Sequence, residues 1–157
     1  MKKLILPLLA SLAVASPAFA EGGEARAEVR GGVAWSGGSS QDVWGAAAGY
    51  DFDLGQSAFA GFEVSGDKIG VSGTKVGFGL TGRLGAKVGA NAGTRVYGTG
   101  GYTTEYCTGC GGTWTAGGGL EQTVSGKVYV KVEYRHAFDN NFSSSLDAVV
   151  GGVGVRF

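Results

Sequence analysis

Apolar and polar residues alternate along most of the chain beyond residue 21, with the period of two that is typical of β-strands. The pattern is clearest between residues 127 and 137, where three valines and a tyrosine occupy the even positions from 128 to 134 and mostly charged residues occupy the odd ones. In the fifth segment, glycines blur both faces. Eight segments of about ten residues can be delimited in this way: 25–35, 43–53, 58–66, 75–87, 95–104, 113–122, 127–137 and 147–157.

The number and length of these segments predict an all-β domain, an eight-stranded antiparallel transmembrane β-barrel. Single-chain bacterial barrels have an even number of strands, and a tilted strand needs about 9–11 residues to cross the bilayer core. Short connections alternate with longer polar ones, as expected for turns inside and loops outside, with both chain termini inside; the exception is residues 88–94, an expected turn that runs long. A soluble β-sandwich or lipocalin-like barrel would alternate similarly, but its surface should carry more lysine and glutamate.

The tryptophans agree with a membrane barrel. Trp35, Trp44 and Trp114 all fall near the expected outer ends of their strands. Aromatic side chains form girdles at the membrane–water interfaces of such barrels. This placement favours lipid, rather than a soluble core, as the surroundings of the apolar face.

The first twenty residues have the features of a cleaved export signal. Lys2 and Lys3 precede an apolar run over residues 4–14, and Ala18 and Ala20 form a small-x-small cleavage site. The run is shorter than the ~20 residues that a spanning helix needs. We therefore expect a Sec-type signal peptide over residues 1–20 and a barrel domain over residues 21–157.

Glycine is the outlier of the composition, with 32 of 157 residues against a usual share of about 7%. Only two prolines are present, so the glycines indicate ordered β-structure with tight turns rather than a disordered tract. Removal of Lys2 and Lys3 with the signal leaves 11 basic against 13 acidic residues. No basic excess remains to indicate nucleic acid as a partner.

The face opposite the apolar one carries charges of both signs. In an eight-stranded barrel this face lines a lumen just wide enough to be filled by side chains. Buried charges without partners are costly, so we expect these groups to pair across the lumen and close it. A gated, ion-selective pore is the alternative, because inward glycines would leave room for water. The expected lumen charge network consists of Arg26, Glu28, Arg30, Glu63, Arg83, Glu121, Lys131, Glu133, Arg135 and Arg156.

Cys107 and Cys110 are the only cysteines and fall in an expected outer loop. In an exported protein this setting favours a disulfide that rigidifies the loop. A redox role is the alternative, but no helix N-terminus or nearby cation is evident to lower a thiol pKa. Two cysteines without a nearby histidine also fall short of a zinc site. We expect a Cys107–Cys110 disulfide, with no metal and no cofactor.

His136, the only histidine, is the one candidate for catalysis. It lies at the expected outer end of the seventh strand, near Tyr134, Glu133 and serines 143–145. A lipid-modifying enzyme would need a nucleophile and a base facing the lipid. The His-x-Ser spacing of barrel lipid A deacylases is absent, because an alanine and a phenylalanine follow the histidine. We expect a residue of the barrel rim and no catalytic site.

Several short motifs, in their order and spacing, resemble the small outer-membrane β-barrel family of opacity-type and OmpA/OmpX-like surface proteins. The resemblance covers the mature chain and implies a structural, adhesive or immune-exposed surface protein, of a kind often described as a porin. It also implies that the last strand, with Val153, Val155 and Phe157 on one face, is the signal recognised by the barrel-assembly machinery. The motifs are Gly49-Tyr-Asp-Phe52, Arg83-Leu-Gly85, Tyr97-Gly-Thr-Gly-Gly-Tyr102, Trp114-Thr-Ala-Gly117, Val132-Glu-Tyr-Arg135 and Val155-Arg-Phe157.

Pattern and resemblance together predict a monomeric barrel in the outer membrane of a Gram-negative bacterium, surrounded by outer-membrane lipid and lipopolysaccharide. Its expected role is structural or interactive. An extracellular ligand would bind the loops near Trp44, between Tyr102 and Trp114, or at residues 139–142. A narrow porin-like channel is the second hypothesis, and a lipid-modifying enzyme is the third.

Overall fold

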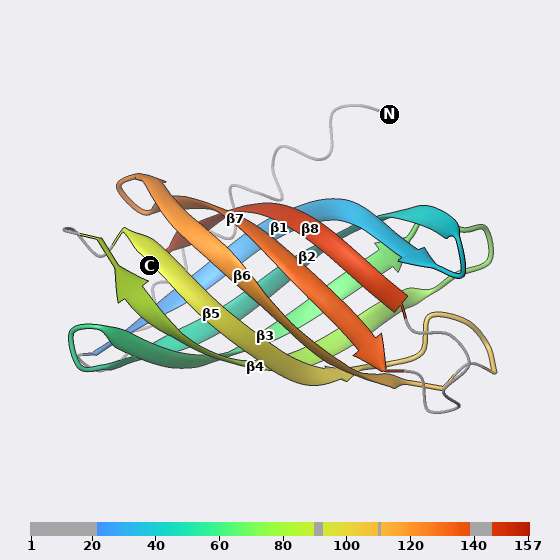
Figure 1. Cartoon of the computed structure of the whole chain (residues 1–157), viewed down its shortest axis with the longest axis horizontal. Coiled ribbons are helices and arrows are strands. Elements are labelled where there is room, and N and C mark those ends of the chain that lie inside the picture. The colour runs from blue at the N-terminus through green and yellow to red at the C-terminus, as the bar shows by residue number, and fades with distance from the viewer. Residues whose placement is uncertain (1–21, 90–92, 110, 139–145) are drawn as a thin grey trace.

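The computed structural model describes residues 22–89, 93–109, 111–138 and 146–157, so the expected signal peptide lies outside the described residues. Eight strands follow one another around a closed barrel, each antiparallel to its neighbours (Figure 1). This confirms the eight-stranded antiparallel barrel expected from the alternation. The strands are β1 (Gly23–Ser36), β2 (Ser39–Leu54), β3 (Ala58–Ile69), β4 (Val76–Val88), β5 (Thr94–Thr103), β6 (Thr113–Ser125), β7 (Val128–Phe138) and β8 (Leu146–Arg156).

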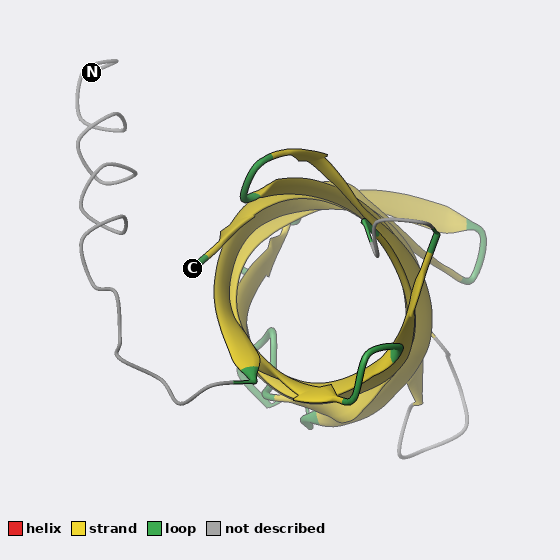
Figure 2. Cartoon of the chain, turned by 90° about the vertical axis from the view of Figure 1, so that its left-hand side faces the viewer, coloured by secondary structure: helices red, strands yellow, loops and turns green. Residues whose placement is uncertain are grey.

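The barrel closes where β8 returns to β1. Their ladder runs from Arg26 opposite Arg156 to Trp35 opposite Asp147, and the end view shows a continuous ring (Figure 2). Just beyond the ladder, the Phe157 N–H donates to a β1 carbonyl oxygen at 2.9 Å. Closure removes the unpaired edge that an open sheet would expose, which is the condition for a sheet to cross hydrocarbon.

Large apolar side chains cover the outside of the barrel and remain exposed in the isolated chain. Soluble monomers rarely expose contiguous apolar patches larger than a few hundred Å². An apolar belt that runs around the whole wall is instead typical of a lipid-facing surface. All eight strands contribute to it, for example through Val29, Phe52, Phe62, Leu80, Val96, Leu120, Val132 and Val153. Among the described residues, no helix is long and apolar enough to span a membrane.

Aromatic side chains lie toward both ends of this belt. We call the end that holds the start of β1 the inner end, and the opposite end the outer end. Trp35, Trp44 and Trp114 are exposed toward the outer end. Toward the inner end, the rings of Phe52 and Phe62 lie 6.3 Å apart. Two aromatic bands are the arrangement expected of a membrane barrel.

The connection between β1 and β2 differs from the sequence expectation. The second strand was expected to begin at residue 43, but β2 begins at Ser39, which pairs with Ser36. Gly37 and Gly38 form the turn between them, with φ values of 56° and 86°. Two consecutive positive φ values give the tight hairpin turn whose twist matches that of the strands. The polar residues 39–42 therefore extend the sheet rather than forming a loop.

Candidate functional site

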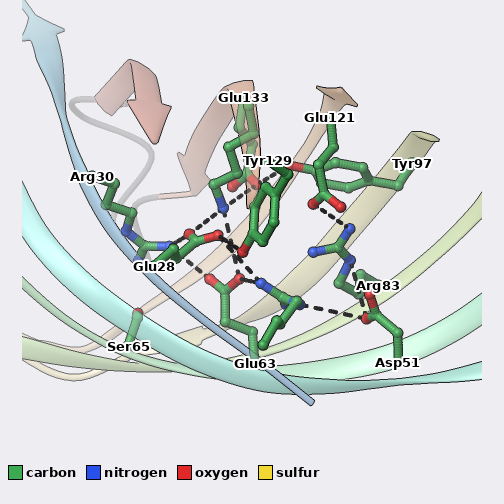
Figure 3. Close-up of polar contacts among 12 residues, drawn as sticks. Glu28, Arg30, Asp51, Glu63, Ser65, Arg83, Tyr97, Glu121, Tyr129 and Glu133 are labelled. Atoms are coloured by element: carbon green, nitrogen blue, oxygen red, sulfur yellow. Dashed lines mark hydrogen bonds and ion pairs between the residues drawn. The ribbon is translucent and has the colours of Figure 1, made fainter. Parts of the chain in front are cut away.

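Charged side chains fill the middle of the lumen. Six basic and six acidic residues are buried, and the partly buried Arg135 joins them. They extend from several strands toward one another, with tyrosines among them (Figure 3). The buried charged residues are Arg26, Glu28, Arg30, Asp51, Glu63, Asp67, Arg83, Arg95, Glu121, Lys131, Glu133 and Arg156.

Glu63 of β3 contacts four basic side chains in the outer half of this network. Its carboxylate lies 2.8 Å from Arg26 Nη1 and 2.6 Å from Arg30 Nη1, both on β1. From β7, Lys131 Nζ lies at 3.7 Å and Arg135 Nη2 at 3.2 Å. Because β3 and β7 are four strands apart in a ring of eight, these two contacts cross the lumen.

Two tyrosine hydroxyl groups donate hydrogen bonds to further carboxylates of the outer half. Tyr129 donates to Glu28 and Tyr97 donates to Glu133, each at 2.8 Å. Lys131 Nζ lies 2.5 Å from Glu28 and 3.3 Å from Glu133. Each of these buried carboxylates thus has both a cation and a hydroxyl donor, which offsets the cost of removing its charge from water.

Asp51 of β2 and Glu121 of β6 each form ion pairs with two arginines in the inner half of the network. Asp51 lies 3.5 Å from the Arg83 guanidinium and 3.2 Å from that of Arg95. Arg83 also contacts Glu121 at 3.1 Å, and Arg156 forms a second ion pair with Glu121. These pairs connect β2, β4, β5, β6 and β8 through the interior of the barrel.

Aromatic rings pack against the guanidinium groups. Arg83 Cζ lies 4.1 Å from the ring centroid of Tyr97, and Arg156 Cζ lies 4.6 Å from that of Tyr129. Both distances are within the range of cation–π contacts. A side-chain carbon at Gly119 would come within 2.7 Å of the Tyr97 ring, so a glycine is needed there to leave room for it. Some inward glycines therefore make room for large side chains rather than for water.

The structure places all ten charged residues expected in the lumen within this network, together with three that the sequence pattern did not predict there. Asp51 lies 3.5 Å from Arg26 and so joins the two halves. Asp67, which pairs with Arg30, lies one residue beyond the expected end of the third strand. Arg95 lies in the fifth segment, whose glycines hide which face points inward. Alternation alone could have located Asp51.

A cavity enters the barrel at each end. The outer cavity has a volume of about 340 Å³ and is lined in part by Arg30 and Asp67. The inner cavity has a volume of about 500 Å³ and is lined in part by Arg95 and Arg156. The two cavities share no lining residue, and Glu63 lines neither of them.

A model of the outer membrane protein beta-barrel domain family matches residues 6–157. The chain belongs to this family. Membership agrees with the resemblance of the sequence motifs and with the apolar belt around the barrel. No curated protein sequence matches the chain.

Solved structures of other outer-membrane barrels share the fold. Neisserial surface protein A is 12% identical, with a TM-score of 0.57, covering 86% of this chain and 97% of that one. The N-terminal barrel of Pseudomonas aeruginosa OprF is 16% identical, with a TM-score of 0.57 and coverages of 85% and 97%. The Yersinia pestis attachment invasion locus protein Ail is 11% identical, with a TM-score of 0.52 and coverages of 88% and 100%. At these identities the likeness establishes the fold alone.

His136 lies on a different face of this outer-membrane barrel from the lumen network. Its Nδ1 lies 2.7 Å from Asp147 Oδ1, and the exposed Tyr134 donates to the same oxygen at 2.6 Å. Glu133 is buried in the lumen, so the Ser/His/Glu set considered from the sequence does not form around it. Serines 143–145 lie outside the described residues.

The other expected site residues lie at the two ends of the barrel. Cys107 belongs to the connection between β5 and β6, whereas Cys110 is outside the described residues, so their pairing stays a prediction. Val153 and Val155 are exposed toward lipid on β8, and Phe157 follows them at the inner end. Among the residues that the structure describes, no group of three or more His, Cys, Asp or Glu side chains could hold a metal.

The substitution Glu63→Gln tests the importance of the lumen network for stability. It removes the negative charge that four cations share and leaves the buried network with an excess of positive charge. We expect the free energy of unfolding to fall by about 3–5 kcal/mol, measured by urea titration in lipid vesicles.

The matched control is Glu105→Gln. Glu105 forms an exposed ion pair with Lys75 at 3.6 Å, and its loss should change the free energy of unfolding by at most about 1 kcal/mol. Equally small effects of both substitutions would contradict a stabilising role of the network.

Proposed function

We propose that this chain is a surface protein of the outer membrane, with a structural or interactive role and a barrel closed to solutes. The observation that carries the proposal is the contact of Glu63 with Lys131 and Arg135 across the lumen. An ion passing through would have to separate buried charge pairs, and each charge left without its partner costs several kcal/mol.

The dimensions of the barrel support the same proposal. An eight-stranded barrel has an interior just wide enough for side chains to fill it. Between the two cavities, the side chains of Glu63, Tyr129, Lys131 and Glu121 are buried and line neither cavity. A solute would therefore have to displace side chains that are held by several partners each.

The interactive role would belong to the outer connections. Loops on a rigid scaffold commonly carry binding residues, and here residues 104–112 connect β5 to β6 at the outer end. The expected Cys107–Cys110 disulfide would rigidify this connection, and an extracellular ligand is the partner that we propose for it. The name of the Yersinia pestis neighbour refers to attachment and invasion, but its 11% identity supports only a shared fold.

The two chain ends support a proposal about biogenesis. We propose that residues 1–20 are a cleaved Sec-type signal peptide in a Gram-negative bacterium. The barrel-assembly machinery would recognise the last strand through Val153, Val155 and Phe157. The finished barrel would be a monomer surrounded by outer-membrane lipid and lipopolysaccharide.

Export and assembly can be tested on the protein extracted from outer membranes. Mass spectrometry should find a mature chain that begins at Glu21. A chain truncated before Phe157 should reach the outer membrane in a smaller amount than the full chain. Retention of the first 20 residues, or unchanged assembly without Phe157, would contradict the corresponding part of the proposal.

Conductance in planar lipid bilayers tests the closed lumen. The wild-type protein should show no stable, reproducible conductance steps. The double variant Glu63→Ala/Arg135→Ala keeps the charge balance but removes a contact across the lumen, and it should show small steps. The control Lys75→Ala/Glu105→Ala, which removes an exposed pair outside the lumen, should behave like wild type.

Reproducible steps from the wild-type protein would contradict the closed lumen and favour the narrow porin-like channel. Hydrolase or acyltransferase activity on outer-membrane lipids that is lost in His136→Ala would instead support the enzyme hypothesis.

A further inference from the structure

The side chains that face the lumen change from polar to apolar along the barrel axis. The inner cavity is lined largely by polar side chains such as Lys87, Gln122 and Lys127. The wall of the outer cavity instead consists mainly of small and branched apolar side chains, together with Thr103, Thr113 and Thr115. The apolar ones include Ala34, Val43, Ile69, Leu146, Ala148 and Val150. Lipid does not reach this surface, because other residues of the same strands face the outside of the barrel.

The floor of the outer cavity is polar and belongs to the charge network. Each guanidinium nitrogen of Arg30 donates a hydrogen bond there, to Glu63 or to Asp67. Arg135 is different, because its Nη1 lies 3.8 Å from Asp67, beyond hydrogen-bond distance, and makes no hydrogen bond with a described residue. Its side chain is 18% exposed and lines the cavity. Arg135 therefore offers the N–H groups of Nη1 to a molecule in the cavity.

Tyr106 offers a second donor at the wall. The connection between β5 and β6 bends into the mouth, where the Tyr106 carbonyl oxygen accepts from the Lys75 N–H at 2.7 Å. Its ring lies against Gly77 of β4, where a side-chain carbon would come within 2.7 Å of it. Burial and the nearby Asp67 carboxylate raise the pKa of Tyr106 to about 12, so its hydroxyl group stays protonated. No hydrogen bond joins this group to another described residue.

We propose that the outer cavity binds a small, uncharged amphipathic molecule, with its apolar body against the barrel wall and one hydrogen-bonding group at Arg135 and Tyr106. Apolar walls with a few convergent polar groups are typical of small-molecule sites, which also occur in the mouths of β-barrels. Neither lipid nor the protein core covers the apolar wall of this cavity. An apolar ligand body would cover it and so remove it from water, which is favourable.

Charge and volume define the class of ligand. The outer half of the network contains four basic and four acidic side chains, so it has no net charge that would attract an ion. These residues are Arg26, Arg30, Lys131 and Arg135, with Glu28, Glu63, Asp67 and Glu133. The volume of about 340 Å³ holds roughly ten non-hydrogen atoms, at about 30 Å³ for each water-sized group.

Ile69 provides a direct reporter of binding. It lines the cavity, and Ile5, the only other isoleucine, lies in the expected signal peptide. In lipid nanodiscs, titration with 1-hexanol should shift the methyl resonance of Ile69 along a saturating curve. The methyl resonances of Leu80, which faces outward, should change only linearly, because they report alcohol dissolved in the lipid.

Two substitutions on neighbouring positions of β8 separate the cavity from the lipid. Ala148→Phe fills the cavity and should abolish the saturating shift of the Ile69 resonance. Val149→Phe places its side chain on the outward face and should leave this shift unchanged. Folding of both variants is checked by the difference in mobility between heated and unheated samples on SDS gels. If Ala148→Phe does not fold, Tyr106→Phe provides the test, since it removes one donor and should weaken binding.

Three results would overturn the proposal. The first is an Ile69 resonance that does not shift, as expected if the chain itself occupies the cavity. The second is an Ile69 resonance that shifts linearly together with those of Leu80, as expected from alcohol in the lipid alone. The third is saturation that persists unchanged in Ala148→Phe or, where that variant does not fold, in Tyr106→Phe.

Discussion

The need to satisfy every backbone hydrogen bond inside the bilayer determines the architecture of this barrel. In hydrocarbon, each unpaired N–H or C=O group costs several kcal/mol, so a sheet can cross only if its last strand returns to its first. Here β8 returns to β1. With eight strands, closure leaves a lumen only as wide as the side chains that point into it. This narrowness limits which residues can face inward.

Two kinds of inward residue satisfy that limit together. Glycines such as Gly119 leave room at the wall for the ring of Tyr97, and charged groups fill much of the remaining space. None of these charges could be buried alone, and the buried set contains six basic and six acidic residues. The pairing that offsets the cost of burial is also the reason for proposing a closed barrel. Toward the outer end the charges give way to an apolar wall, where we infer a ligand site.

The number of strands and the direction of their faces could be predicted from the sequence, because a period of two belongs to each strand separately. Features that depend on contacts between strands could not. β2 begins at Ser39 because a two-glycine turn pairs it with β1, and Asp67 enters the lumen because β3 continues to Ile69. The expected charged residues lie in the network, but no local pattern predicts that Glu63 pairs with Arg135, 72 residues away. Nor does any pattern predict that the Tyr106 ring covers a glycine of β4.

The outward face of the barrel lies in hydrocarbon, and two outward valines at different depths allow this to be measured. Val132, near the middle of β7, is 48% exposed, and Val124, beside the inner turn between β6 and β7, is 55% exposed. In lipid vesicles, Val132→Arg should lower the free energy of unfolding by about 2–4 kcal/mol, and Val124→Arg by about 0–1 kcal/mol. Equal costs at the two positions would contradict the account, because the outward face would then lie in a single medium rather than cross a bilayer.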